Sequence, residues 1–323
     1  MTILLLGAQG QLGWELGASL STLGQVWHFG RKEADLSSLA DLEALVRRIK
    51  PRVIINAAAH TKVDQAETEP ALAHTVNAEA PGLLARLARE YSAWLVHYST
   101  DYVYDGKKDG PYAETDTGAP LNVYGRTKLA GDLAVMESGC RHLIFRTSWV
   151  FSQHGRNFPK TILELARQED NFAVVADQYG SPTGVELISS ATALALSQAI
   201  RRADDVSGLY NLVASGYVSW HQYAIYVVTR ARELGWSLLA KPGNIRPRST
   251  EDGGRKAVRP TNSRLSTEKF QQTFGLTPPP WQYYVDRVLW AWTKAEAPAA
   301  GRPPHVLGLK FIQPMNSLPG RLD

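Results

Sequence analysis

Cysteine is almost absent from this sequence, and its scarcity excludes several kinds of site. The chain of 323 residues contains one cysteine, Cys140. A single cysteine cannot form a disulfide within the chain, and it cannot build a cysteine-based metal site. Scarce cysteine is typical of proteins from a reducing compartment, so we predict a cytoplasmic location.

Long apolar runs are also missing. Residues 3–6 form a short apolar run near the N-terminus, too short for the core of a signal peptide and without a basic leader. No apolar stretch approaches the ~20 residues needed to cross a bilayer. We therefore expect no membrane association.

The sequence carries little excess charge of either sign. Its 35 Lys and Arg against 31 Asp and Glu give a net charge of +4, and the basic residues form no cluster. Nucleic-acid binding is normally accompanied by a clustered basic face, so we do not predict it. A hydrophobic content of 44% supplies core for one large domain or two modest ones.

Strand and helix patterns alternate through the first half of the chain. Apolar runs predict strands at 3–6, 26–29, 53–56, 94–99 and 142–150. Helical patterns separate them at 11–23, 37–50 and 70–91, with Pro81 opening or kinking the last. This alternation predicts an α/β fold, a doubly wound parallel sheet of Rossmann-like type.

The rhythm loosens after residue 150. Helices are expected at 158–168, 184–201, 219–234 and 280–295, and short strands near 173–175 and 209–213 as extensions of the sheet. Residues 241–256, rich in Pro, Gly and charge, read as a loop. We predict a dinucleotide-binding domain at 1–150 that later segments can rejoin, a smaller C-terminal substrate-binding lobe at 151–295, and an extended or disordered tail at 296–323.

A glycine turn follows the first strand. "LLLGAQGQLG" places Gly7, Gly10 and Gly13 between a strand and a helix, with Gln11 and Leu12 between the last two. Such glycines allow a tight turn and close backbone approach, and the helix N-terminus attracts a pyrophosphate. We predict that all five residues contact a dinucleotide cofactor; a turn that serves packing alone is the alternative.

The end of the second strand bears on the choice of cofactor. Arg31 stands where a carboxylate would bind the ribose of NAD, so we predict NADPH, with NADH as the alternative cofactor and a solvated basic loop as the alternative role of Arg31. Asp35 and Leu36 are expected to flank the adenine. Small residues after the third strand leave room for the cofactor: Ala57, Ala58 and Ala59.

Tyr124 and Lys128 are spaced by four residues in "LNVYGRTKLAGD". On a helix, residues at i and i+4 share a face. A nearby ammonium lowers the pKa of a phenol, and a tyrosine so adjusted can exchange a proton during a reaction. An ordinary amphipathic helix with a surface lysine is the alternative, because such spacings are common.

The motifs together resemble the extended short-chain dehydrogenase/reductase family. "NAAAHTKVDQAE", "VHYSTDYVYDG", "PLNVYGRTKLAG", "LIFRTSWVF", "DQYGSPTG" and "RPTNSRL" are similar to segments of the dTDP-4-dehydrorhamnose reductases. The resemblance covers about residues 1–295. It implies reduction of the C4 ketone of dTDP-4-dehydro-β-L-rhamnose to dTDP-L-rhamnose, the last step of dTDP-rhamnose synthesis.

The resemblance also implies roles for particular residues. Tyr124 would protonate the ketone oxygen, Lys128 would bind the nicotinamide ribose and lower the pKa of Tyr124, and Thr100 would hydrogen-bond the reacting oxygen. The implied sugar-site residues are Thr61, Val63, Thr100, Asp101, Tyr102 and Trp149, and Thr61 would also contact the cofactor. Family members often bind Mg²⁺ at a homodimer contact, where Glu15 and Glu186 would be the ligands; plain surface charge is the alternative for both.

Three other functions are compatible with this fold. Dehydratases of the superfamily carry an Asp-Glu pair after the threonine, whereas this chain has Asp101 and Tyr102, which favours simple reduction. A nucleotide-sugar epimerase stays an alternative, as does a non-catalytic regulatory subunit of the methionine adenosyltransferase type. We assign no chemical role to His60 or His97 and expect His97 to be a packing position of its strand.

Overall fold

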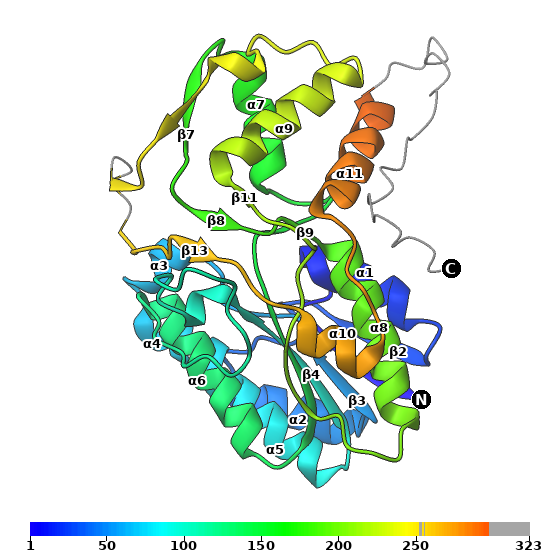
Figure 1. Ribbon diagram of the computed structural model, residues 1–323. Coiled ribbons are helices and arrows are strands. Elements are labelled where there is room, and N and C mark those ends of the chain that lie inside the picture. The colour runs from blue at the N-terminus through cyan, green and yellow to red at the C-terminus, as the bar shows by residue number, and fades with distance from the viewer. Residues whose placement is uncertain (252–253, 255, 297–323) are drawn as a thin grey trace, which may run out of the picture.

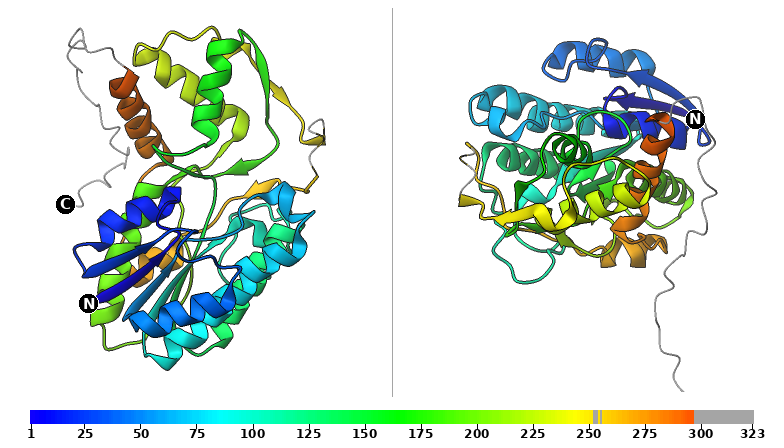
Figure 2. Two further views of the ribbon diagram at one scale, coloured as in Figure 1. Left: turned by 180° about the vertical axis from the view of Figure 1, so that it is seen from behind. Right: turned by 90° about the horizontal axis from the view of Figure 1, so that it is seen from above.

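The computed structural model describes residues 1–251, 254 and 256–296. The tail predicted at 296–323 lies, apart from its first residue, outside the described residues. Within them, the chain forms a large sheet lobe and a smaller lobe beside one end of it (Figures 1 and 2).

A six-stranded parallel sheet forms the centre of the large lobe. Its strand order is β2-β1-β3-β4-β5-β10, so the chain reverses its direction of progress between β1 and β3. The bounds are β1 Thr2–Leu6, β2 Gln25–Phe29, β3 Val53–Asn56, β4 Trp94–Thr100, β5 Arg141–Thr147 and β10 Gly208–Asn211. Ligands of doubly wound sheets bind at such a reversal, outside the carboxyl ends of the strands.

Helices cover both faces of this sheet, because alternate strand residues point to opposite sides. Ile3, Leu5 and Val96 pack with one set of helices, α1 (Gln11–Leu20), α8 (Val185–Arg201) and α10 (Glu268–Phe274). Leu4 and Ile54 pack with the other set, α2 (Leu39–Ile49) and α5 (Ala80–Glu90), together with the C-terminal half of α6 (Val123–Glu137). The predicted doubly wound fold is confirmed.

The segment before α5 is less regular than expected. It consists of α3 (Val63–Ala66), α4 (Pro70–His74) and a π-helical turn at Thr75–Glu79 that runs into α5. Pro81 therefore lies just after the π-turn, where the regular i→i−4 hydrogen bonding is already interrupted. A π-turn inside a helix often marks a functional site.

The smaller lobe is built from short paired strands and three helices. Its bounds are β6 Val150–Phe151, α7 Phe158–Gln168, β7 Phe172–Val175, β8 Tyr179–Gly180, β9 Thr183–Gly184, β11 Val218–Ser219, α9 Trp220–Glu233, β12 Ile245–Arg248, β13 Asn262–Ser263 and α11 Trp281–Glu296. Single turns of 3₁₀-helix occur at Asp101–Val103 and Pro242–Asn244. The four helices expected after residue 150 are present within one residue of their predicted limits, although α8 covers the sheet lobe.

Three predictions about this half differ from the structure. The strand near 209–213 joins the central sheet as β10, as expected, but β7 does not: it pairs with β12. Part of the loop predicted at 241–256 is therefore a strand, because residues 245–248 find backbone partners far away in sequence. α10 was missed, as it spans only seven residues.

Candidate active site

The glycine turn packs directly on the third strand. Gly7 has φ +77°, and a Cβ on it would lie 2.8 Å from the backbone of Ala57. A Cβ on Gly13 would lie 2.0 Å from the Gly7 carbonyl oxygen, so neither position admits a side chain. α1 begins at Gln11 with no side-chain cap and no acidic residue in its first turn. The turn thus presents an uncapped, positive helix end beside Ala57–Ala59, which suits a phosphate.

Gln11 and Leu12 are placed differently from the glycines. Gln11 Oε1 accepts hydrogen bonds from Ser152 Oγ at 3.1 Å and Asn157 Nδ2 at 3.4 Å, which tie α1 to the smaller lobe. The Leu12 side chain packs on the hydrophobic core. Both side chains are thus held by contacts within the chain, and the predicted contact of these residues with a cofactor stays a prediction.

The loop after β2 keeps Arg31 open to solvent. Its side chain is 76% exposed and forms an ion pair with Asp35 at 3.7 Å. Asp35 also accepts hydrogen bonds from the backbone and hydroxyl of Ser37, which hold the pKa of Asp35 below its usual value. Leu36 is a buried core residue, so packing accounts for it without an adenine. Arg31 is thus open to solvent, and its contact with a cofactor phosphate stays a prediction.

Thr100 and Tyr124 meet at the end of β4. Thr100 Oγ1 donates to Asp101 Oδ1 at 3.1 Å and accepts from the Tyr102 backbone N–H at 3.1 Å. Burial raises the pKa of the Tyr124 phenol above its usual value, and a hydrogen bond with Thr100 partly offsets that rise. The Tyr102 ring meets the Tyr124 ring edge-on at 5.6 Å. The predicted phenol and hydroxyl therefore adjoin each other.

Local sequence explains why α6 begins where it does. Asn122 caps the helix, since its side chain accepts a hydrogen bond from the Gly125 N–H at 2.8 Å. A Cβ on Gly125 would lie 2.1 Å from the Tyr102 carbonyl oxygen. Glycine here lets the helix approach the end of β4, and this approach brings Tyr124 to Thr100.

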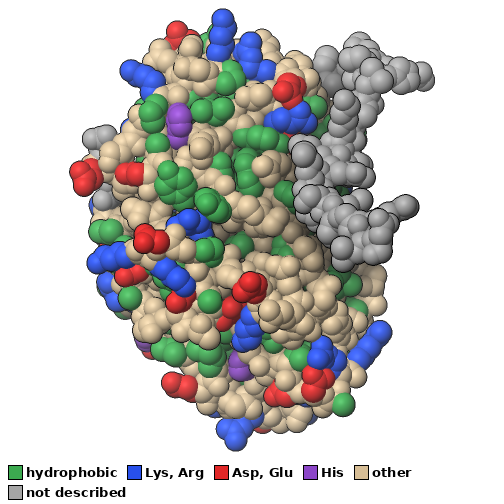
Figure 3. Space-filling view, viewed as in Figure 1, with side chains coloured by type: hydrophobic (Ala, Val, Ile, Leu, Met, Phe, Trp, Pro, Cys, Tyr) green, Lys and Arg blue, Asp and Glu red, His purple; other side chains and the backbone are tan. Residues whose placement is uncertain are grey.

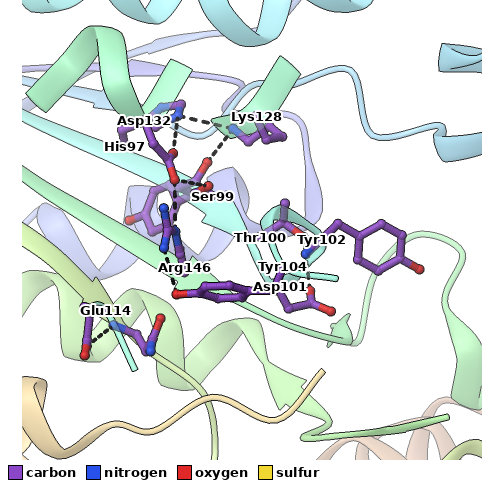
Figure 4. A network of polar contacts seen from close by, with 12 residues as sticks. His97, Ser99, Thr100, Asp101, Tyr102, Tyr104, Glu114, Lys128, Asp132 and Arg146 are labelled. Carbon is purple, nitrogen blue, oxygen red and sulfur yellow. Dashed lines mark hydrogen bonds and ion pairs between the residues drawn. The ribbon is translucent and has the colours of Figure 1, made fainter. Parts of the chain in front are cut away.

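Lys128 points its ammonium at the sheet. Nζ donates to the Tyr98 carbonyl at 2.7 Å and lies 3.2 Å from His97 Nε2, and the residue is 1% exposed (Figure 4). Burial lowers the pKa of Lys128 to about 8, opposed by the charge of Asp132. Burial is the largest influence on the pKa of the Tyr124 phenol, and the Lys128 ammonium is engaged by β4, so the lowering of the Tyr124 pKa by Lys128 stays a prediction.

A buried ion pair lies beneath Lys128. Asp132, one turn further along α6, accepts hydrogen bonds from Ser99 Oγ at 2.9 Å and Arg146 Nε at 3.0 Å. Arg146 also donates to the Tyr104 hydroxyl at 2.7 Å (Figure 4). The pair is almost fully enclosed, so removing one partner would leave an uncompensated buried charge.

Asp101 is a buried carboxylate at the same edge of the sheet. Burial raises its pKa to about 6, although hydrogen bonds with Ser263 and Thr100 oppose the rise. Its Oδ2 atom has no hydrogen-bond partner among the described residues. A buried, unpaired oxygen beside Thr100 is suited to bind a hydroxyl of a bound molecule.

Trp149 adopts a strained backbone conformation with φ +47°. Its ring stacks on Trp220 with centroids 3.5 Å apart, and Gly180 leaves room for it. A positive φ is rare for a large aromatic residue, and residues with such backbone strain are concentrated at functional sites. The other two predicted sugar-site residues lie just after β3: Thr61 is exposed and Val63 begins α3.

Sequence reasoning missed Asn77, which lies in the π-turn. Its side chain accepts from the His60 N–H at 2.8 Å and donates to the His60 carbonyl and to Thr127 Oγ1, each at 3.1 Å. A Cβ on Gly131 would collide with the Asn77 carbonyl oxygen. Asn77 thus clamps the loop after β3 onto α6. The sequence signal that could have revealed it is the break at Pro81.

Glu15 and Glu186 approach each other between α1 and α8. The charge of Glu15, added to burial, raises the pKa of Glu186. In the part of the chain that the structure describes, however, no three His, Cys, Asp or Glu side chains gather as a metal site would require. Two carboxylates of one chain leave most of the octahedral sphere of Mg²⁺ unfilled, so the residues present do not by themselves build the predicted site.

Comparisons with known proteins show the family of this chain. A family model described as RmlD substrate binding domain matches residues 1–294. The chain belongs to the dTDP-4-dehydrorhamnose reductase family. It is 48% identical to the dTDP-4-dehydrorhamnose reductase of Escherichia coli K12 over 90% of this chain and 97% of that protein. It is 45% identical to that of Burkholderia thailandensis over 88% of this chain and 97% of that protein.

A solved structure places the likeness in three dimensions. The crystal structure of dTDP-4-dehydrorhamnose reductase from Bacillus anthracis in complex with NADP superimposes with a TM-score of 0.80 at 33% identity, covering 89% of this chain and 98% of that one. The resemblance read from the motifs is therefore confirmed. Among the described residues, no helix is long and apolar enough to span a bilayer.

Proposed function

We propose that this protein reduces the C4 ketone of dTDP-4-dehydro-β-L-rhamnose to dTDP-L-rhamnose with NADPH. The observation that carries the proposal is the meeting of Tyr124 and Thr100 at the carboxyl end of β4, in a chain whose relatives bear this activity in their names. The glycine turn supports a dinucleotide beside that edge, and a related structure contains NADP.

The residues divide the work as follows. The cofactor supplies a hydride when bound. Tyr124 donates the proton to the ketone oxygen, and its raised pKa keeps the phenol protonated at neutral pH. Thr100 hydrogen-bonds the same oxygen, and Asp101 and Trp149 orient the sugar. Lys128 binds the nicotinamide ribose, since an ammonium with two N–H groups engaged keeps a third for a hydroxyl.

Arg31 favours NADPH over NADH, because an exposed guanidinium pairs well with a 2′-phosphate.

The remaining predictions concern the oligomeric state, the metal and other partners. A homodimer is supported by exposed Trp14, Leu194 and Trp290 on α1, α8 and α11. Size-exclusion chromatography with and without EDTA tests both the homodimer and the Mg²⁺ prediction. Lys, Arg, Asp and Glu are interspersed on the face drawn in Figure 3, which offers no support for nucleic acid as a partner.

A panel of 4-keto nucleotide sugars, assayed with NADPH and with NADH, tests the proposal. We expect stoichiometric NADPH oxidation with the 6-deoxy-4-keto dTDP sugar and a single reduced product. Epimerised product without net NADPH consumption would support the epimerase instead. Recovery of a stoichiometric partner enzyme from cell extract, without turnover of any sugar, would support the regulatory subunit.

A further inference from the structure

His97 is an unexpected neighbour of the proposed catalytic lysine. It is 1% exposed on β4, and both ring nitrogens have polar neighbours: Asn56 Nδ2 lies 3.2 Å from Nδ1, and Lys128 Nζ lies 3.2 Å from Nε2. Strand register explains the first contact, because Asn56 and His97 are paired residues of β3 and β4. A histidine that only filled space would need neither contact.

The chemistry of these groups fixes the proton on the ring. A lysine ammonium can only donate, so Nε2 must accept from Lys128 and the proton of a neutral imidazole must reside on Nδ1. The other charged atom near Nε2, Asp132 Oδ1, is 3.9 Å away, too far for a hydrogen bond. With the proton on Nδ1, the Asn56 amide must present its oxygen rather than its nitrogen to the ring. Flipping the amide does this, and the Ala58 N–H then loses the 3.3 Å hydrogen bond that it donates to Asn56 Oδ1.

The surroundings keep the imidazole neutral. Burial, and then the nearby positive charge of Lys128, hold the pKa of His97 well below its usual value. Asp132, the anion nearest to the ring, accepts from Ser99 and Arg146 through Oδ2 (Figure 4), and its other oxygen, Oδ1, lies 3.9 Å from Nε2, beyond hydrogen-bond reach. His97 is therefore a permanent acceptor rather than a proton carrier.

We propose that His97 is a positioning residue: its Nε2 and the Tyr98 carbonyl hold the Lys128 ammonium at one point beneath the end of β4, ready for the cofactor. The inference rests on the proposed function, because it takes Lys128 to be the residue that binds the nicotinamide ribose. Without His97, the ammonium would keep only its hydrogen bond to the Tyr98 carbonyl and would be more mobile. Binding of the ribose would then carry the entropic cost of fixing the ammonium in place.

Two amide variants distinguish the role of Nε2 from that of Nδ1. The amide of His97→Gln reaches the place of Nε2, whereas that of His97→Asn reaches only the place of Nδ1. We expect His97→Gln to retain the NADPH dissociation constant within about threefold and His97→Asn to weaken it about tenfold or more, as for one lost hydrogen bond to a charged group. Equal affinities for NADPH in the two variants would overturn the proposal.

A double-mutant cycle then asks whether His97 acts through Lys128. In a Lys128→Met background, His97→Asn should weaken NADPH binding no further. A full additional loss in that background would show that His97 acts by another route. Fluorescence titration of NADPH needs no sugar substrate, so failure of the cycle is distinct from failure of the proposed reaction.

A third measurement needs no variant and so does not depend on their folding. The ¹⁵N spectrum of the histidine side chains in the wild-type protein reports which ring nitrogen is protonated. We expect His97 Nε2 to be unprotonated and Nδ1 protonated throughout pH 6–7, where the Lys128 amine is charged. A proton on Nε2 would exclude the hydrogen bond from the Lys128 ammonium and sink the proposal.

Discussion

Gly125 lies so close to Tyr102 that a Cβ on it would come within 2.1 Å of the Tyr102 carbonyl oxygen. The start of α6 and the 3₁₀ turn that follows β4 therefore meet backbone to backbone. Tyr124 directly precedes Gly125 in the chain, and Thr100 lies two residues before Tyr102. The contact between the two elements thus sets the distance between the phenol and the hydroxyl on which the proposed chemistry depends.

Gly125→Ala should therefore lower both stability and turnover. Alanine within a helix is normally worth up to about 1 kcal/mol over glycine, but here overpacking should cost about 1–3 kcal/mol net. Thermal unfolding and steady-state rates measure the two effects. Gly110→Ala is the matched control, because nothing lies within 4 Å of a Cβ at that position. Equal behaviour of the two variants would contradict the close approach.

Tyr124→Phe should reduce turnover by about 10² or more while NADPH still binds, since it removes the proton donor and leaves the ring. Rates with the dTDP sugar and a fluorescence titration of NADPH give the two quantities. Tyr283→Phe, an exposed ring on α11, serves as the control. Wild-type turnover in Tyr124→Phe would remove the phenol from the mechanism.

Asp101→Asn should stabilise the protein at neutral pH. The folded state keeps the Asp101 proton up to about pH 6, whereas an unfolded aspartate loses it near its usual pKa of 3.8. The folded state thus binds more protons between these values, and the stability contributed by Asp101 falls as pH rises through them. Above pH 6 the variant avoids the buried charge, a gain of up to about 3 kcal/mol.

Unfolding temperatures at pH 4 and pH 7.5 check this sign. The gain should be present at the higher pH and should shrink toward the lower one. Asp109→Asn, at an exposed position of the same loop, should show no such difference. Turnover of Asp101→Asn should fall if Asp101 binds the sugar. A variant that is less stable at pH 7.5 than at pH 4, relative to wild type, would mean that the carboxylate is stabilised by its surroundings.

Arg31→Ala should raise the KM for NADPH about tenfold and leave that for NADH nearly unchanged, because only NADPH carries the 2′-phosphate. The ratio of kcat/KM for the two cofactors is the decisive quantity. Arg48→Ala, an exposed arginine on α2, controls for the loss of surface charge. An equal loss with both cofactors would show that Arg31 does not read the phosphate.

The sequence by itself determined the features that depend on short spacings. Apolar runs and their separators predict the alternating strands and helices, and the glycines at 7, 10 and 13 predict the turn, because these follow from steric rules within a few residues. The spacing of Tyr124 and Lys128 predicts only that they share a helix face, and the reductase assignment comes from the resemblance of several motifs together.

Only the tertiary structure decided what those residues touch. The Lys128 ammonium turns to His97, 31 positions earlier, and Asn77 fastens His60 to α6; neither partner is marked by periodicity. The pairing of β12 with β7 could not be predicted from the sequence either, because residues 245–248 form a strand only through their backbone partners. Contacts between distant segments depend on how the elements pack, and packing is a property of the whole chain.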